Sequence, residues 1–176
     1  MNQIIYALAL VTLMTPMVVS AQDLPGLDKS PADIAYFRKG DSPMVKVIYS
    51  RPLRNGRTIF GDVVKYGDVW RTGANEATEI RFYQDVTFGG KSVKAGTYSL
   101  FTIPGEQTWT VILSSDLDIW GAYRYNKTKD VVRVDVPAGK TASAVEAFTI
   151  AFKKEDGNAR MILAWDAVMV EVPVVF

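Results

Sequence analysis

The stretch FTIAFKKEDGNARMILAW, residues 148–165, decides the fold because it reads as two strands joined by a tight turn. Large apolar residues occupy every second position from Phe148 to Phe152, and again from Met161 to Trp165. This period of two is typical of strands with one face in a core and the other toward solvent. Asp156-Gly157 between the runs tolerates positive φ, so the stretch predicts an antiparallel hairpin.

The same pattern extends outward from this hairpin through most of the chain. Gly89-Gly90 separates DVTF from KSVKAG, and IPGEQ (residues 103–107) separates TYSLFT from WTVIL. About a dozen short strands with such turns are typical of a sandwich or an open barrel. We expect an all-β fold over residues 32–176, a single antiparallel β-sandwich of the jelly-roll or Ig-like kind, with at most one short helix. The only helix candidate is RTIFGDVVKYG, residues 57–67.

The first residues predict export. Residues 4–19 form an apolar run without charge, and small residues follow at Ser20 and Ala21. This pattern predicts a cleaved signal peptide over residues 1–21, followed by a polar lead-in over residues 22–31 and a periplasmic or secreted domain. The alternative is a retained anchor, but the run is shorter than the roughly 18–20 residues of a spanning helix, and Pro16 interrupts it. No stable membrane span is expected after cleavage.

The composition excludes several kinds of chemistry. The chain has no histidine and no cysteine, which excludes Ser–His–Asp, thiol and typical zinc catalysis. The sequence DLDIWG, which starts at Asp116, begins like a calcium loop, but Trp120 and a missing closing glutamate argue against it. We therefore expect no metal and no cofactor. The net charge of +1 gives no reason to expect a nucleic-acid partner.

Charged and aromatic residues gather before Ile80 in the strings YSRPLRNGR and WRTGANEAT. Arginine guanidinium groups grip carboxylate, phosphate or sulfate groups with two parallel hydrogen bonds. In this interpretation a ligand would contact Arg51, Arg57, Trp70, Arg71, Asn75 and Glu76. The alternative is a structural lock, in which Arg71 and Glu76 form a buried ion pair and Trp70 is ordinary core.

A second group of residues lies in DIWGAYRYN, where Trp120 and Tyr123 flank Gly121. Exposed aromatic faces there would stack on sugar rings, while neighbouring polar groups bind the hydroxyls. The alternative is that the two rings cover an edge of the sandwich.

Four strings resemble the domain of unknown function 2911 family: residues 49–82, 95–113, 120–136, and FTIAF with LAWDAVMVEVPV near the end. WRTGANEAT and AGTYSLFTIPG are the longest and most specific of the shared motifs. The resemblance implies an exported β-rich domain and no particular reaction. The eight candidate residues named above belong to its motifs.

Three hypotheses about function follow. The first is a noncatalytic binding module for a glycan or a small anionic ligand. The second is a hydrolase or lyase acting on a sugar, with Glu76 as acid or base, Arg71 stabilising charge, and Tyr98 or Tyr123 assisting. The third is an assembly protein that binds a protein partner or a second copy through an edge strand, with Pro173 in the hydrophobic closing strand limiting further pairing.

Overall fold

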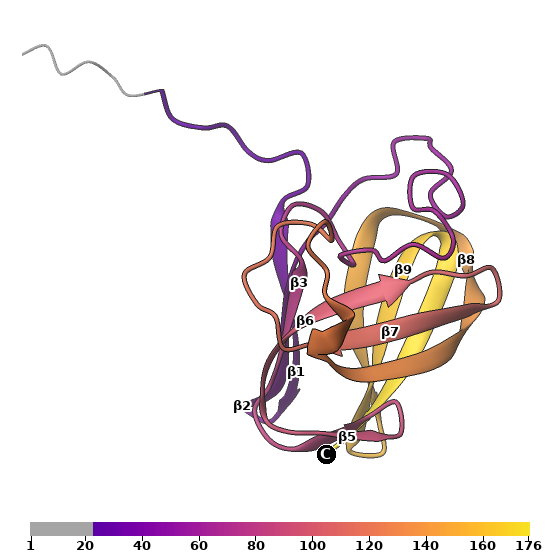
Figure 1. Cartoon of the computed structure of the whole chain (residues 1–176). Helices are drawn as coiled ribbons and strands as arrows, with labels where there is room; N and C mark the ends of the chain where they lie inside the picture. The colour runs from indigo at the N-terminus through magenta and orange to yellow at the C-terminus, as the bar shows by residue number, and fades with distance from the viewer. Residues whose placement is uncertain (1–22) are drawn as a thin grey trace, which may run out of the picture.

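The computed structural model describes residues 23–176, and within this range the chain is almost entirely strands and turns (Figure 1). No α-helix occurs among these residues, although one short 3₁₀ turn, η1, spans Lys127–Lys129. The strands are β1 (Ala32–Lys39), β2 (Ser42–Ser50), β3 (Thr78–Phe82), β4 (Val86–Phe88), β5 (Lys91–Val93), β6 (Gly96–Ile103), β7 (Thr108–Ser114), β8 (Asp130–Glu155) and β9 (Asn158–Val175).

All nine strands belong to one antiparallel sheet with the order β1-β2-β3-β6-β7-β8-β9-β4-β5. The sheet is not closed, because β1 and β5 are its two edges. The predicted all-β antiparallel class is therefore confirmed. A sandwich or jelly roll of two separate sheets is not shown by this strand order.

The predicted hairpin turns are confirmed. Gly89 and Gly90 connect β4 to β5 with φ angles of 54° and 84°, and Asp156 and Gly157 connect β8 to β9 with φ angles of 45° and 79°. Positive φ at both central residues gives a turn whose twist matches that of the paired strands. The third turn, within residues 103–107, joins β6 to β7.

The expected dozen short strands are instead nine strands, of which β8 and β9 are long. The first part of β8 pairs with β7 as far as Pro137, and its remainder pairs with β9. The β8–β9 register shifts between Lys140 and Thr149, where the extra residues of β8 lie. Such irregularities bend a strand and increase its twist, so one strand serves both parts of the sheet.

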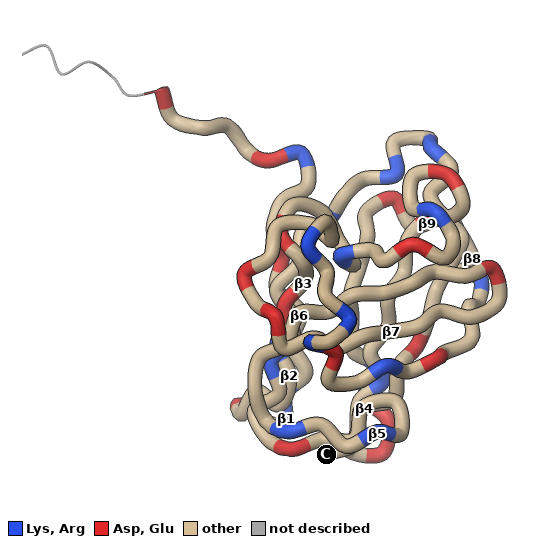
Figure 2. Tube along the Cα trace, viewed as in Figure 1, with Lys and Arg blue, Asp and Glu red and all other residues tan. Residues whose placement is uncertain are grey.

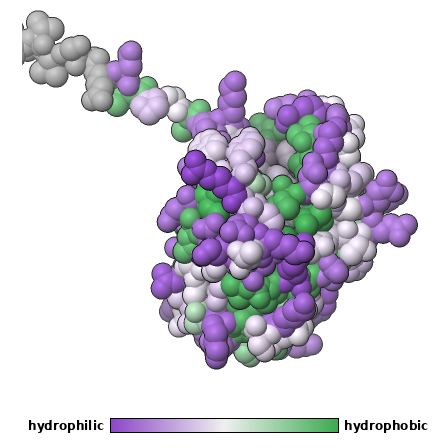
Figure 3. All heavy atoms as spheres, viewed as in Figure 1, coloured by the Kyte–Doolittle hydropathy of each residue, from purple (hydrophilic) through white to green (hydrophobic). Residues whose placement is uncertain are grey.

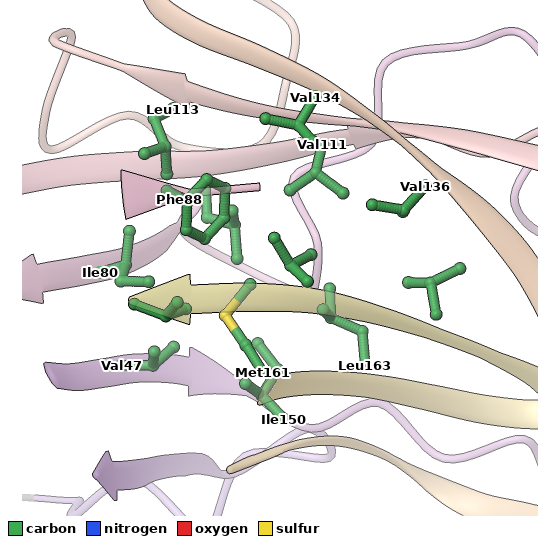
Figure 4. Close-up of a cluster of buried hydrophobic side chains, with 14 of the residues drawn as sticks. Val47, Ile80, Phe88, Val111, Leu113, Val134, Val136, Ile150, Met161 and Leu163 are labelled. Carbon is green, nitrogen blue, oxygen red and sulfur yellow. The ribbon is translucent and has the colours of Figure 1, made fainter. Parts of the chain in front are cut away.

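The core lies where side chains from distant strands meet (Figure 4). Val47 on β2, Ile80 on β3 and Val111 on β7 are fully buried, and so is Met161 on β9. They follow the predicted alternation, with one face of each strand inward. Each such side chain contributes roughly 1.5–3 kcal/mol relative to full exposure, so the core is the main source of stability.

The absence of an α-helix from residues 23–176 agrees with the expected limit of one short helix, but two local interpretations are not confirmed. Residues 57–67 form turns rather than a helix, because Gly61 and Gly67 have φ angles of 91° and 82° and the backbone of Ile59 and Gly61 pairs with Val64. The closing strand is not an edge either. β9 lies between β8 and β4, and Gly89 donates its N–H to the carbonyl of Pro173 at 2.8 Å.

The predicted signal peptide, residues 1–21, lies outside the described residues. Export therefore stays a prediction from the sequence.

Candidate functional site

The connection between β2 and β3, residues 51–77, carries most of the predicted site residues and crosses the top of the view in Figure 1. Two isolated bridges fix its path. Trp70 exchanges backbone hydrogen bonds of 2.7 and 2.9 Å with Thr102 on β6, and Leu53 pairs with Ala147 on β8. The connection is therefore attached to two different parts of the sheet.

A cluster of buried aromatic residues supports this connection from below. Trp70 stacks on Trp165 with ring centroids 5.8 Å apart and 18° between the planes, and Phe148 meets Trp70 edge-on at 5.0 Å. The indole N–H of Trp70 donates to the carbonyl of Gly73 at 3.0 Å. Trp70 is thus buried and hydrogen-bonded, and its ring faces are not free to stack on a ligand.

An open cavity of about 460 Å³ lies over this aromatic wall. Arg71 is its most unusual residue. The Nε atom of Arg71 is buried and has no hydrogen-bond partner, and the guanidinium forms no ion pair with any residue from 23 to 176. Buried polar groups are nearly always paired, so this donor calls for an explanation. The lining residues are Ser30, Pro52, Arg57, Val63, Val64, Lys65, Asp68, Val69, Trp70, Arg71, Gly73, Ala74, Asn75 and Trp165.

The charged groups of this Arg71 cavity are mainly basic. Arg57, Lys65 and Arg71 face one carboxylate, Asp68. Figure 2 shows basic residues along the loop at the top of the view. Arg57 is oriented by the backbone, since its guanidinium donates to the carbonyls of Leu53 and Arg54. Lys65 was missed by sequence reasoning, because its segment, residues 57–67, resembles a helix.

The backbone next to Arg71 is strained. Thr72 has a φ of 56°, and it is the only β-branched residue with positive φ between residues 23 and 176. Such a residue in the left-handed region is a real outlier and costs about 1–3 kcal/mol. Buried hydrogen bonds hold it there: its hydroxyl lies 3.1 Å from that of Thr102, and its carbonyl accepts from Thr78 at 2.6 Å. Strain of this kind is common at ligand sites.

Arg51, which was predicted to contact a ligand, instead binds other parts of the protein. Its Nε donates to the carbonyl of Phe148 at 3.0 Å, and its two terminal nitrogens reach Asp33 at 3.0 Å and Thr149 at 2.9 Å. Arg51 therefore connects β1 and β8 to the end of β2, and it does not line the Arg71 cavity.

Asn75 lies at the rim of the cavity and fastens the lead-in to it. Its side-chain amide donates to Asp28 at 3.1 Å, and its carbonyl accepts from Gly121 at 3.0 Å. Asp28 also accepts from the backbone N–H of Ser30, and this bond, followed by that from Asn75, lowers the pKa of the Asp28 carboxyl. The lead-in, the connection and the loop after β7 thus meet at one residue.

Glu76 is exposed and lies apart from Arg71. It lines a smaller hollow of about 210 Å³ together with Glu79 and Asp118. No ion pair joins Arg71 and Glu76, so the predicted Arg–Glu lock is absent from the described residues. The structure therefore does not bring the proposed acid and its charge stabiliser into one cavity.

Trp120 and Tyr123 form a separate surface on the loop after β7. Trp120 is 60% exposed and Tyr123 is 85% exposed, so neither ring is buried under an edge of the sheet. Both line an open hollow of about 670 Å³. The structure thus divides the eight predicted residues among several places rather than one.

A network that sequence reasoning missed holds the end of this loop. The hydroxyl of Tyr125 donates to Asp130 at 2.6 Å, while Arg133 donates to the same carboxylate oxygen at 2.7 Å. Burial, and then the hydrogen bond to Asp130, raises the pKa of Tyr125 to about 12. The three-residue spacing of Asp130 and Arg133 was the only signal of this network in the sequence.

The family model of proteins of unknown function called DUF2911 matches residues 30–174. The chain belongs to the DUF2911 family. The match confirms the resemblance drawn from the motifs, and it includes the whole Arg71 cavity as well as the loop of Trp120 and Tyr123.

Searches among curated proteins and among solved structures gave no match. In the part of the DUF2911 chain that the structure describes, there is no group of three or more acidic, histidine or cysteine residues placed to hold a metal ion. No helix within residues 23–176 has the length and apolar character needed to cross a membrane.

The side chains that line the Arg71 cavity are mostly hydrogen-bond donors. The Arg71 cavity of this DUF2911 protein offers guanidinium, ammonium and amide donors, but only one carboxylate, Asp68. Donors of this kind match the oxygens of a carboxylate, phosphate or sulfate group. No pair of acids lines the cavity, as glycoside hydrolysis would require.

Proposed function

We propose that this protein is an exported, noncatalytic binding protein that holds a small oxyanion in the Arg71 cavity. The observation that carries the proposal is the buried Nε of Arg71, which has no acceptor among residues 23–176. Leaving a buried donor unpaired costs roughly 1–3 kcal/mol. An oxygen of a bound carboxylate, phosphate or sulfate group would supply the missing acceptor.

The charge of the cavity supports the same ligand class. Among the described residues that line the cavity, three are basic (Arg57, Lys65 and Arg71) and one is acidic (Asp68), so an anion enters a region of net positive charge. Lys65 has one weak ion pair with Asp62 at 3.7 Å, and both of these side chains are largely exposed. An exposed pair at this distance contributes little, so Lys65 is available to a ligand.

The local backbone supports a preformed site. A side chain at Gly73 would place its Cβ 3.0 Å from the carbonyl of Ser50 and 3.1 Å from the hydroxyl of Thr78, so only glycine fits here without adjustment. Together with the strained Thr72, this close packing fixes the turn that follows Arg71. A preformed site loses less conformational entropy on binding.

The hydrolase or lyase interpretation has less support. Arg71 and Glu76 line different cavities, and the acids near Glu76 are Glu79 and Asp118. A mechanism that joins Glu76 to Arg71 has no shared space for a substrate. Binding without catalysis needs only the donors that the Arg71 cavity has.

Two finer assignments complete the proposal. Export is supported by the apolar run of residues 4–19. Packing of the sheet as two sandwich-like layers is supported by contacts between strands far apart in the strand order. One example is Phe37 on β1, which stacks on Phe176 after β9 with ring centroids 5.2 Å apart.

Thermal unfolding of the purified protein tests the proposal. The probes are phosphate, sulfate, citrate, glucose 6-phosphate and galacturonate, added to a chloride buffer. A ligand at a hundred times its dissociation constant stabilises by about 2.7 kcal/mol. For a domain of this size such a gain raises Tm by roughly 5–11 °C.

Arg71→Ala should abolish the shift, and Arg71→Lys should reduce it because lysine lacks the planar fork of donors. Arg81→Ala is the matched control. It removes the same charge from an exposed side chain on β3 that lies over the ring of Tyr83 and outside the cavity. The proposal fails if none of the five anions raises Tm, or if Arg71→Ala and Arg81→Ala respond alike.

A further inference from the structure

We propose that the loop after β7 is a second binding surface, which stacks the rings of a neutral oligosaccharide on Trp120 and Tyr123. This surface is independent of the Arg71 cavity, with which it shares no lining residue. The first observation is the contrast in burial. Trp120 is 60% exposed, whereas Trp70, Trp109 and Trp165 are 7%, 2% and 2% exposed.

The exposed rings lie on a well-supported loop. Ala77 donates its N–H to the carbonyl of Ile119 at 2.8 Å, Trp120 forms a bridge with Glu76, and Gly121 donates to Asn75. The loop is thus joined on one side to the connection that carries Arg71. Loops held by this many backbone bonds present their side chains in a fixed geometry, which lowers the entropy cost of binding.

Gly121 sets the position of Tyr123. Gly121 has a φ of 69°, and a Cβ at this position would lie 2.8 and 2.9 Å from two ring carbons of Tyr123. The phenol ring therefore rests directly on the glycine backbone while 85% of the residue stays exposed. At the far end of the loop, Tyr125, Asp130 and Arg133 form the hydrogen-bonded network described above.

The chemistry of the hollow matches a sugar better than an anion or a membrane. Two aromatic rings supply flat apolar faces for the C–H face of a pyranose, and Leu117 extends the apolar area. Asp116 and Asp118 accept hydrogen bonds from hydroxyl groups, and Arg124 donates them. Two carboxylates against one guanidinium give a net negative lining, which repels phosphate groups and anionic lipid headgroups.

The visible face of residues 23–176 has no broad apolar area (Figure 3), which favours a small, local binding surface. Figure 3 shows that hydrophilic residues cover much of the visible face, with smaller hydrophobic areas between them. A few apolar and aromatic groups with convergent polar groups are typical of small-ligand sites. A broad apolar face would instead favour a protein or membrane partner.

Fluorescence quenching by acrylamide tests this inference on the intact protein. Trp120 is the only substantially exposed residue among the four tryptophans, so quenching reports on it almost alone. The probes are cellohexaose, chitohexaose, xylohexaose and maltohexaose. At saturation, at least one is expected to reduce the quenching constant twofold or more, because a stacked ring shields the indole.

Variants locate the binding. Calorimetric affinity for the protecting sugar should fall at least tenfold in Trp120→Ala and in Tyr123→Ala. Tyr83→Ala removes an aromatic residue that is 39% exposed elsewhere on the surface, and it should leave the affinity unchanged. Arg71→Ala should also bind the sugar normally, so loss of anion binding and loss of sugar binding are distinguishable.

Three outcomes overturn the inference. The first is that none of the four sugars protects Trp120. The second is that Trp120→Ala binds the sugar as well as the unmodified chain does. The third is that Trp120 is shielded by phosphatidylcholine–phosphatidylglycerol vesicles and by no sugar, which would make the loop a lipid-binding surface.

Discussion

Arg51→Met should destabilise this protein strongly, whereas Arg71→Met should leave its stability nearly unchanged in the absence of a ligand. Both residues belong to the same connection and to the same family motifs. They differ in their partners. Arg51 donates three hydrogen bonds within the protein, whereas the Nε of Arg71 is buried and has no acceptor in the described part of the chain. Methionine retains much of the apolar stem in both cases.

The expected magnitude follows from these partners. At about 1 kcal/mol for each hydrogen bond, Arg51→Met should lower the free energy of unfolding by about 3 kcal/mol. We use this modest value because the ion pair between Arg51 and Asp33 is partly exposed, with side chains 33% and 42% accessible. Arg71→Met removes an unpaired buried donor, so the free energy of unfolding should not fall by more than about 1 kcal/mol, and a gain is consistent with the reasoning.

Urea unfolding followed by tryptophan fluorescence measures the difference. The buffer should contain chloride only, so that no oxyanion fills the cavity. With a slope of about 2 kcal/mol per molar urea, Arg51→Met should lower the midpoint by about 1.5 M, and Arg71→Met by less than about 0.5 M. If Arg71→Met lowered the midpoint as much as Arg51→Met, Arg71 would be a structural lock and the case for a ligand would lose its main support.

Three further predictions concern the stability of the structure that supports the two sites. The pKa of Tyr125 is raised to about 12 in the folded protein, so the unfolded chain loses this proton first as the pH rises. The free energy of unfolding should therefore fall between about pH 10 and pH 12. Tyr125→Phe should reduce this fall, which urea midpoints measured as a function of pH would show. Gly89→Ala would place a Cβ against a methyl carbon of Val134 at a φ of 54°, so it should cost about 2 kcal/mol or more, whereas Gly90→Ala, with no heavy atom within 4 Å of its Cβ, should cost less in the same urea assay. Trp165→Ala should cost about 3–5 kcal/mol because it empties the aromatic wall under the Arg71 cavity, and a loss of Tm below about 5 °C in calorimetry would contradict this packing.

Local sequence patterns predicted the parts of the fold that depend on neighbouring residues. The alternation around Val47 and Met161 gave the buried face of each strand, and Asp156-Gly157 gave the turn between β8 and β9. These features are predictable because side-chain direction in a strand repeats every two residues, and because two-residue turns need particular φ angles. The alternation could not show that β8 continues for 26 residues through its irregular middle.

The candidate site was predicted less well, because its geometry depends on contacts between distant segments. Arg71 lines the cavity, whereas its expected partner Glu76 lines another hollow. Lys65 lines the cavity and lies in a segment with the apolar spacing of a helix. Two glycines with positive φ in this segment are incompatible with a helix. Trp165 is far away in the sequence and joins the site through its stacking on Trp70.

The sequence by itself determined the all-β class, the three hairpin turns, the family and the absence of histidine and cysteine chemistry. Only the tertiary structure decided that β9 is an inner strand, that Arg51 is fully engaged while Arg71 is not, and that Trp120 is exposed while Trp70 is buried. The physical reason is the range of the interactions. Alternation and turn conformation act over a few residues, whereas burial and hydrogen-bond partners depend on segments that only folding brings together.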